Sequence, residues 1–253
     1  MLILFVFLLI LMMPSVAYAW GPLTHFYLGH QVLALGASVV PIGIYNLIRK
    51  FKNDFLYGNI SADIIIGKRF QAFEKSSHNW NVGIKLLKAA RTEQRKSFAY
   101  GYLTHLAADT VAHNYYIPKF LAMTNLTHSI LEVKADSIID KEYRYMVRNI
   151  DKLVQLRNDV FLEKFLERLF LSFKTNKKIF KGVLLLSRFS HIISVINFVD
   201  KRLPNGVTAE EIFDFQSKSL VMMLELLRDG EISSVFKKDP MGRVHIKPFN
   251  KPI

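Results

Sequence analysis

The sequence of 253 residues contains no cysteine. That absence excludes a disulfide framework, a cysteine-ligated zinc finger, an iron–sulfur cluster and a thiol nucleophile, so any metal must be held by histidine, carboxylate or backbone groups. Acidic residues are also scarce, with 21 Asp and Glu against 34 Lys and Arg, and the formal net charge is +13. A positive excess of this size favours contact with anionic lipid headgroups, cell-wall polymers or nucleic acid.

Strand-type alternation, internal repeats and a Gly-x-Ser-x-Gly motif are missing as well. The chain is 51% hydrophobic and 22% charged, which is typical of a folded protein rather than a disordered one. Apolar residues recur at helical spacing almost throughout, and we expect one all-α domain with a C-terminal helical extension. The predicted helices cover 24–50, with breaks at Gly36 and Pro41, then 81–96, 97–116, 127–150, and roughly 151–175, 178–199 and 208–228. The tail from Asp239 is expected to be irregular because it holds three prolines.

The N-terminus has the features of a signal peptide. Residues 1–13 are all apolar, and Ala17-Tyr18-Ala19 forms a small-x-small cleavage pattern, although no Lys or Arg follows Met1. The apolar run is shorter than the ~20 residues that span a bilayer. We therefore expect residues 1–19 to be removed and residues 20–253 to be secreted or periplasmic; the alternative is an uncleaved membrane anchor. Cleavage would give Trp20 a free α-amino group, which together with its own carbonyl oxygen can chelate a metal.

Histidines and carboxylates are spaced for metal binding. His105, Asp109 and His113 stand at i, i+4 and i+8 in one predicted helix, within an arc of about 80°. His128 and Glu132 repeat the i, i+4 step in the next helix, and helices joined by a short loop usually pack side by side. A single His and carboxylate at i, i+4 is typical of an ion pair on a helix surface. Here the flanking residues are apolar or small, and burying unpaired charged groups among them would be costly, which favours a bound metal. Five ligand-type side chains exceed what one zinc needs, and Asp109 is placed to bridge two ions.

These residues belong to a longer ordered series that resembles the zinc-dependent phospholipase C family over about residues 20–135. The series is Trp20, Thr24-His25, Ser61-Ala62-Asp63, Ser77-His78, Thr104-His105, Asp109, His113, His128 and Glu132. The resemblance implies a single multi-helix domain of the phospholipase C and nuclease type. It also implies a site of three zinc ions that the N-terminal tryptophan of the mature chain completes.

The resemblance assigns the ligands position by position. One zinc would be held by Asp63, His78, His105 and Asp109. A second would be held by His113, His128 and Glu132, and the third by the amine and carbonyl of Trp20 and by His25, with Asp109 shared. The implied activity is zinc-dependent hydrolysis of a phosphodiester bond by a phospholipase C acting on phospholipid headgroups at a membrane surface. Asp63 is the carboxylate expected to orient or deprotonate the attacking water.

Two departures limit what the resemblance implies about substrate. Residues 24–33, and the four-residue step from Asp109 to His113, also resemble the N-terminal domain of glycosylphosphatidylinositol-specific phospholipase D, so C-type and D-type cleavage both stay open. The positions that shape a choline pocket in the secreted phospholipases C are Leu23, Ile64 and Lys75 here. They lack the acidic and aromatic character that a quaternary ammonium requires, so a preference for phosphatidylcholine is not expected.

Two other functions are compatible with the sequence. A single-strand nuclease with the same three-zinc site would use the positive charge to bind nucleic acid, and Trp80, Tyr115 or Tyr116 as stacking platforms for bases. A non-catalytic zinc-binding envelope protein would keep the metal and lack turnover. None of the three functions calls for an obligate protein partner.

Overall fold

The computed structural model describes residues 20–65, 76–123, 128–166, 169, 171–186 and 207–243. No strand occurs in these residues, and the expected all-α fold is confirmed. The α-helices are α2 (Pro22–Leu35), α3 (Ile42–Lys50), α4 (Lys52–Ser61), α5 (Trp80–Ala89), α6 (Glu93–Val111), α7 (Ile117–Met123), α8 (His128–Ser137), α9 (Lys141–Arg148), α10 (Lys152–Glu163), α11 (Phe173–Leu186) and α13 (Ala209–Asp229). The expected signal peptide and Lys75 lie outside the described residues.

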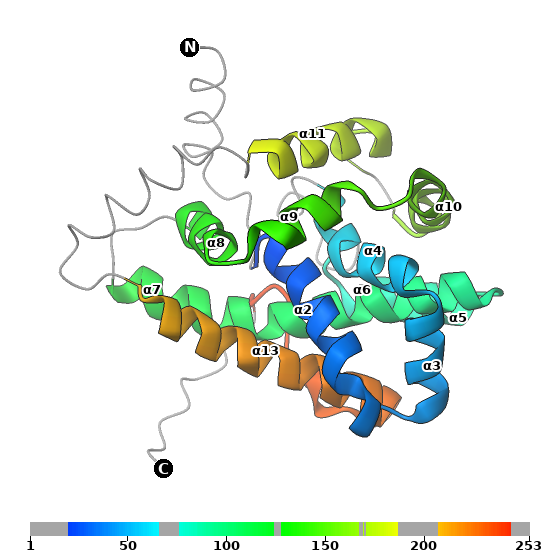
Figure 1. Cartoon of the computed structure of the whole chain (residues 1–253), viewed down its shortest axis with the longest axis horizontal. Helices are drawn as coiled ribbons and strands as arrows, with labels where there is room; N and C mark the ends of the chain where they lie inside the picture. Colours follow the sequence, from blue (N-terminus) through cyan, green and yellow to red (C-terminus); the bar gives the residue numbers. More distant parts are fainter. Residues whose placement is uncertain are drawn as a thin grey trace.

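Helix α6 is the centre of the molecule. In Figure 1 it runs through the middle of the fold, with α13 along one side and α2 and α4 crossing it. From Ser97 to Val111 every residue of α6 except Tyr100 is buried, as expected for a helix covered on all sides. The C-terminal helix α13 packs directly on α6, so the C-terminal part of the chain helps to bury the central helix. No described helix has both the length and the apolar character needed to cross a membrane.

Helices α4 and α6 approach each other through two glycines. A Cβ atom at Gly58 of α4 would overlap the carbonyl oxygen of Phe98, and one at Gly101 of α6 would overlap that of Phe55. The two backbones are therefore in direct contact. Because α4 leads into the 3-10 turn Ala62–Ile64, this contact brings Asp63 close to the middle of α6.

Replacing one of these glycines tests the contact. Gly58→Ala is expected to lower the free energy of unfolding by roughly 3 kcal/mol, because the added methyl group meets backbone that cannot rotate away. Gly43→Ala is the matched control: it also adds a methyl group to a helix, but a Cβ there would meet nothing within 4 Å. The control should be neutral or stabilising by up to about 1 kcal/mol. Chemical denaturation measures both, and equal unfolding midpoints for Gly58→Ala and the wild type would contradict the contact.

Several predicted helix boundaries were wrong. The single helix expected over 81–96 is two helices, because Ala90 is extended and Thr92 caps α6 by accepting a hydrogen bond from the N–H of Arg95 at 3.3 Å. The helix expected over 127–150 divides into α8 and α9, and the one expected over 151–175 ends at Glu163. The helix expected over 97–116 extends past Pro118, because α6, the π turn Ala112–Tyr116 and α7 follow one another without a break.

The other predicted boundaries are closer to the structure. The breaks expected at Gly36 and Pro41 are confirmed, because a short 3-10 turn at Gly36–Ser38 separates α2 from α3. The helix predicted over 208–228 is confirmed as α13, which begins with a capping box formed by Thr208 and Glu211. The helix expected over 178–199 begins earlier, as α11, and residues 187–206 lie outside the described residues.

Candidate metal centre

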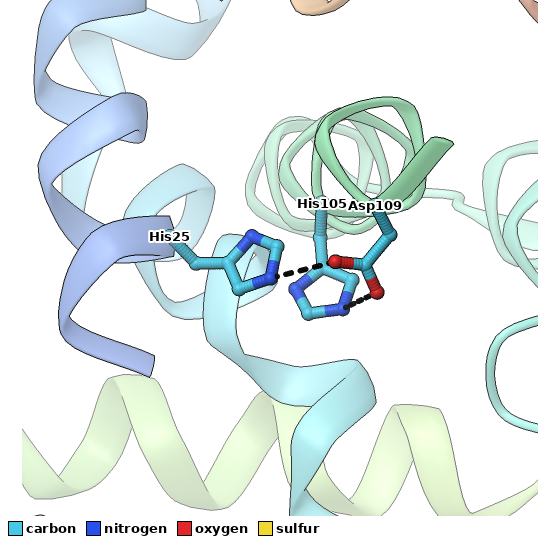
Figure 2. Close-up of side chains that lie close together, drawn as sticks. All are labelled: His25, His105 and Asp109. Carbon is cyan, nitrogen blue, oxygen red and sulfur yellow. Dashed lines mark ion pairs between the residues drawn. The ribbon is translucent and has the colours of Figure 1, made fainter. Parts of the chain in front are cut away.

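Five of the expected ligands converge at the middle of α6. His105 and Asp109 come from α6 itself, and His25 comes from the second turn of α2. Asp63 lies on the 3-10 turn after α4, and His78 lies just before α5. All five side chains are fully buried. Figure 2 shows His25 reaching from its own helix towards the His105 and Asp109 side chains of α6.

The carboxylate of Asp109 lies between two sets of imidazole nitrogens. Its Oδ1 atom lies 3.0 Å from Nε2 of His25. Its Oδ2 atom lies 3.2 Å from Nε2 of His78 and 3.3 Å from Nε2 of His105. This is the arrangement that a carboxylate needs in order to bind one cation through each oxygen.

Asp63 closes the other side of the same cluster. Its Oδ1 atom lies 3.1 Å from Nε2 of His78, and its Oδ2 atom lies 4.0 Å from Nε2 of His25. Within the described parts of the chain, two trios have ligating atoms that all lie within 4.8 Å of one another. They are His25, His105 and Asp109, and Asp63, His78 and His105.

Neighbouring groups fix which nitrogen of His78 and His105 carries the proton. The Nδ1 atom of His105 lies 2.7 Å from the carbonyl oxygen of Asn59, which can only accept, so Nδ1 carries the hydrogen. The hydroxyl of Ser77 donates to the carbonyl of Ala62 at 3.0 Å and is therefore the acceptor for Nδ1 of His78 at 3.1 Å. In the neutral rings both Nε2 atoms then present lone pairs to the cluster. A hydrogen bond from the other ring nitrogen is how proteins orient metal-binding histidines.

The charges of the cluster favour bound cations. Burial lowers the pKa of His25, and the neighbouring His105 lowers it further, so this imidazole is neutral and able to bind a metal. Burial alone would lower the pKa of His105, but Asp109 and Asp63 outweigh it and raise the pKa. Burial would raise the pKa of Asp109, yet His105 and His25 hold it well below its ordinary value. The carboxylate is therefore ionised, and a metal ion would displace the proton of His105.

The hydrogen-bonding groups in this cluster fit a divalent cation. Both ring nitrogens of His25 and both carboxylate oxygens of Asp109 are buried and make no well-aligned hydrogen bond. Leaving such groups unsatisfied costs free energy, so native proteins nearly always give them partners. The Nε2 atoms of His78 and His105 also lie only 3.1 Å apart, so with both rings neutral their lone pairs would face each other, and a cation between them would remove that repulsion. Imidazole nitrogen and carboxylate oxygen are the ligands that zinc takes in the absence of cysteine.

The remaining expected side-chain ligands form a second group. The ring of His113 packs edge-on against that of His128, with centroids 5.5 Å apart, and Nε2 of His128 lies 3.3 Å from Oε1 of Glu132. The expectation that His113 continues the face of His105 and Asp109 stays a prediction. Helix α6 ends at Val111, and His113 lies on a π turn over Ala112–Tyr116 that follows it directly.

Trp20 is held at the start of α2 by its side chain. The indole is fully buried, stacks on Tyr116 with ring centroids 4.5 Å apart, and donates its N–H to the hydroxyl of Ser219 at 2.9 Å. Tyr116 belongs to the π turn that carries His113, and Ser219 belongs to α13. The backbone of Trp20 is therefore tied to the elements that surround both groups of ligands.

The segment after α13 also packs on the candidate centre. Gly242 has a positive φ of 61°, and a Cβ there would lie 2.7 Å from the carbonyl oxygen of His113. The hydroxyl of Ser76 lies 3.2 Å from the sulfur of Met241. The C-terminal segment thus contacts residues next to His78 and the backbone of His113.

Some residues named from the sequence have other roles in the structure. Tyr116 is not a base-stacking platform, because it is fully buried and donates its hydroxyl to the carbonyl of Leu131 at 3.0 Å. Trp80 packs against Phe236 and donates its N–H to a backbone carbonyl. Leu23 and Ile64, expected beside a headgroup pocket, are buried in the core.

Sequence reasoning missed two residues that support the ligands. Asn59 orients His105, and Ser219 binds the indole of Trp20. No local pattern marks these two residues, because their partners lie far away in the sequence. Asp136 is different: it lies four residues after Glu132 and so continues the i, i+4 spacing of α8 by one turn. Burial raises its pKa to about 6, in spite of hydrogen bonds from Thr24 that lower it.

A helical fold whose central helix carries a buried cluster of imidazoles and carboxylates defines a metal-binding α-helical protein. The sequence model of the zinc-dependent phospholipase C family matches residues 24–179, which is more than half of the chain. The protein belongs to this family, which places it at family level among zinc-dependent enzymes that hydrolyse phospholipids. No curated protein and no solved structure gives a significant match. The matched residues include all the expected side-chain ligands, whereas Trp20 and α13 lie outside them.

Proposed function

We propose that this protein is an exported phospholipase C that cleaves phospholipid headgroups at a centre of three zinc ions. The observation that carries the proposal is the position of Asp109, whose two oxygens face His25 on one side and His78 and His105 on the other. Because Asp109 and these imidazoles are fully buried, bulk water does not solvate them, and bound cations would compensate the cost of burying their polar atoms.

The residues divide among three ions as the family resemblance implies. Asp63, His78, His105 and Asp109 would hold one, and the second group would hold another. The third would take His25, Asp109 and the backbone amine and carbonyl of Trp20, which is why cleavage after Ala19 forms part of the proposal. When bound, zinc supplies Lewis acidity to the phosphate oxygens and lowers the pKa of water at the site towards ~7.

The residues of the chain position the reacting groups. Asp63 lies beside His78 at 3.1 Å and His25 at 4.0 Å, and its carboxylate is the group proposed to accept the proton of the attacking water. His78 and His105 are held by their Nδ1 hydrogen bonds, so their Nε2 atoms keep a fixed direction. Burial of the cluster strengthens every charge interaction with the developing phosphate charge, because few water dipoles screen it.

The experiment is a product analysis with matched substrates. The mature protein is incubated at fixed zinc concentration with vesicles that carry different phospholipid headgroups and, separately, with single-stranded DNA. We expect diacylglycerol and a phosphorylated headgroup. Phosphatidic acid would show D-type cleavage, cleaved DNA would favour the nuclease, and bound zinc without turnover would favour the non-catalytic protein; each of these results would contradict the proposal.

Two carboxylate variants test the role of Asp63 in the same assay. Asp63→Asn is expected to lower kcat by about 10²–10⁴-fold, because the carboxamide cannot accept the proton. Asp214→Asn is the control, since Asp214 forms an exposed ion pair with Lys218 on α13. Equal kcat values for Asp63→Asn and Asp214→Asn would exclude Asp63 as the base.

A further inference from the structure

The first turn of α2 is capped by a carboxylate from another helix. Asp136 of α8 accepts the backbone N–H of Thr24 at 2.8 Å and its hydroxyl at 2.7 Å through Oδ1, and the N–H of Leu23 at 3.2 Å through Oδ2. The residue at the N-cap position of α2 is Gly21, which has no side chain to offer. The free N–H groups that every helix start leaves are therefore satisfied from α8.

Gly21 is the residue that makes this contact sterically possible. A Cβ atom at this position would overlap the carboxylate of Asp136. The backbone of Gly21 has φ −69° and ψ 161°, a conformation that any residue adopts, so the requirement for glycine is one of space. The carboxylate thus lies against the backbone of the residue that directly follows Trp20.

This contact joins two parts of the metal centre. Asp136 stands one helical turn after Glu132 and two turns after His128 on α8. Thr24, which donates two hydrogen bonds to Asp136, directly precedes His25. A single buried carboxylate therefore connects the helix of the second ligand group to the segment that runs from Trp20 to His25.

We propose that Asp136 is a positioning residue of the zinc centre, which holds residues 20–25 in the place where Trp20 and His25 share an ion with Asp109. The inference rests on the proposed zinc centre. It predicts that loss of Asp136 weakens the binding of that ion even in a folded protein.

An ordinary helix cap provides the matched control. Asp151 caps α10 with the same chemistry, accepting the N–H groups of Leu153 at 2.7 Å and Val154 at 3.1 Å. Helix α10 carries none of the proposed ligands. If Asp136 were only a cap, Asp136→Ala and Asp151→Ala would both lower the melting temperature and both leave zinc binding unchanged.

The experiment measures zinc bound per chain as a function of free zinc, at a temperature well below each variant's melting transition. Asp136→Ala is expected to weaken the binding of one ion by at least ~10-fold, which is typical when a group that orients metal ligands is lost. Asp151→Ala should bind zinc like the wild type. Asp136→Asn should restore part of the affinity, since its carboxamide oxygen still accepts a hydrogen bond from Thr24. Wild-type zinc binding by folded Asp136→Ala would overturn the inference.

Two further variants keep the test decisive if Asp136→Ala does not fold. Gly21→Ala pushes the carboxylate away without removing its charge and should weaken the binding of the same ion by a similar ~10-fold factor. Thr24→Val removes only the hydroxyl hydrogen bond and should give a smaller loss, which does not add to that of Asp136→Asn. Unchanged zinc binding in both would overturn the inference. A wild-type chain that binds no zinc would instead overturn the proposed function.

Discussion

Replacing Asp109 with asparagine is expected to weaken the binding of two of the three proposed zinc ions and to abolish hydrolysis. Loss of a group that merely orients a metal ligand costs about 10–100-fold, so loss of a carboxylate shared by two ions should cost more than ~100-fold in zinc affinity. The carboxamide keeps the shape of the side chain but offers one neutral oxygen in place of two charged ones. Elemental analysis of the purified variant and a vesicle hydrolysis assay measure the two effects.

Asp159→Asn is the control for loss of a buried carboxylate as such. Asp159 is also buried, but it binds Tyr57 and Lys177, away from the proposed ligands. The control variant should lose stability and retain zinc and activity. Full activity of Asp109→Asn with a normal zinc content would show that Asp109 does not bridge two ions.

Extending the proposed mature chain by one residue before Trp20 is expected to remove one zinc ion and to lower the activity more than ~100-fold. The added residue converts the α-amino group of Trp20 into a peptide nitrogen, which carries no lone pair for a metal. The indole would still stack on Tyr116 and bind Ser219, so the melting temperature of the metal-free protein should change little. Zinc content, hydrolysis and thermal unfolding are measured on chains that begin at Trp20 or one residue earlier.

Trp20→Phe makes the opposite change and completes this test. It keeps the terminal amine and an aromatic ring but loses the N–H that binds Ser219. We expect a normal zinc content and a loss of about 1 kcal/mol in stability, the usual contribution of one hydrogen bond. An extended chain that binds as much zinc as the chain beginning at Trp20 would contradict the role of the amine.

Local sequence pattern predicted those parts of the centre that lie on one helix. His105 and Asp109 share a face because four residues make about one turn of α6, and the structure places their side chains 3.3 Å apart. The π turn that carries His113 was not predicted, because it leaves no mark in the spacing of apolar residues.

The spacing of residues in the sequence could not predict which helices contact one another. Asp63 and His78 reach the cluster because α4 and α6 touch at Gly58 and Gly101, a tertiary contact between residues 43 positions apart (101 − 58). Only the resemblance to a family, in which the same residues occur in the same order, indicated that Asp63 and His78 share a site with His105 and Asp109. Helix α4 itself was not predicted, since it contains Gly58 and Asn59 and is buried on several sides, so it has neither strong helix propensity nor an amphipathic pattern.

Anomalous X-ray diffraction at the zinc absorption edge would locate the ions directly in crystals of the chain that begins at Trp20. We expect three anomalous peaks: one beside Asp63, His78 and His105, one beside His113, His128 and Glu132, and one beside His25 and the terminal amine of Trp20. Each peak should lie ~2.0–2.2 Å from its nitrogen and oxygen ligands, with Asp109 reaching two of them. Crystals of zinc-saturated protein without a peak between Asp109 and the imidazoles of His25, His78 and His105 would contradict the metal centre described above.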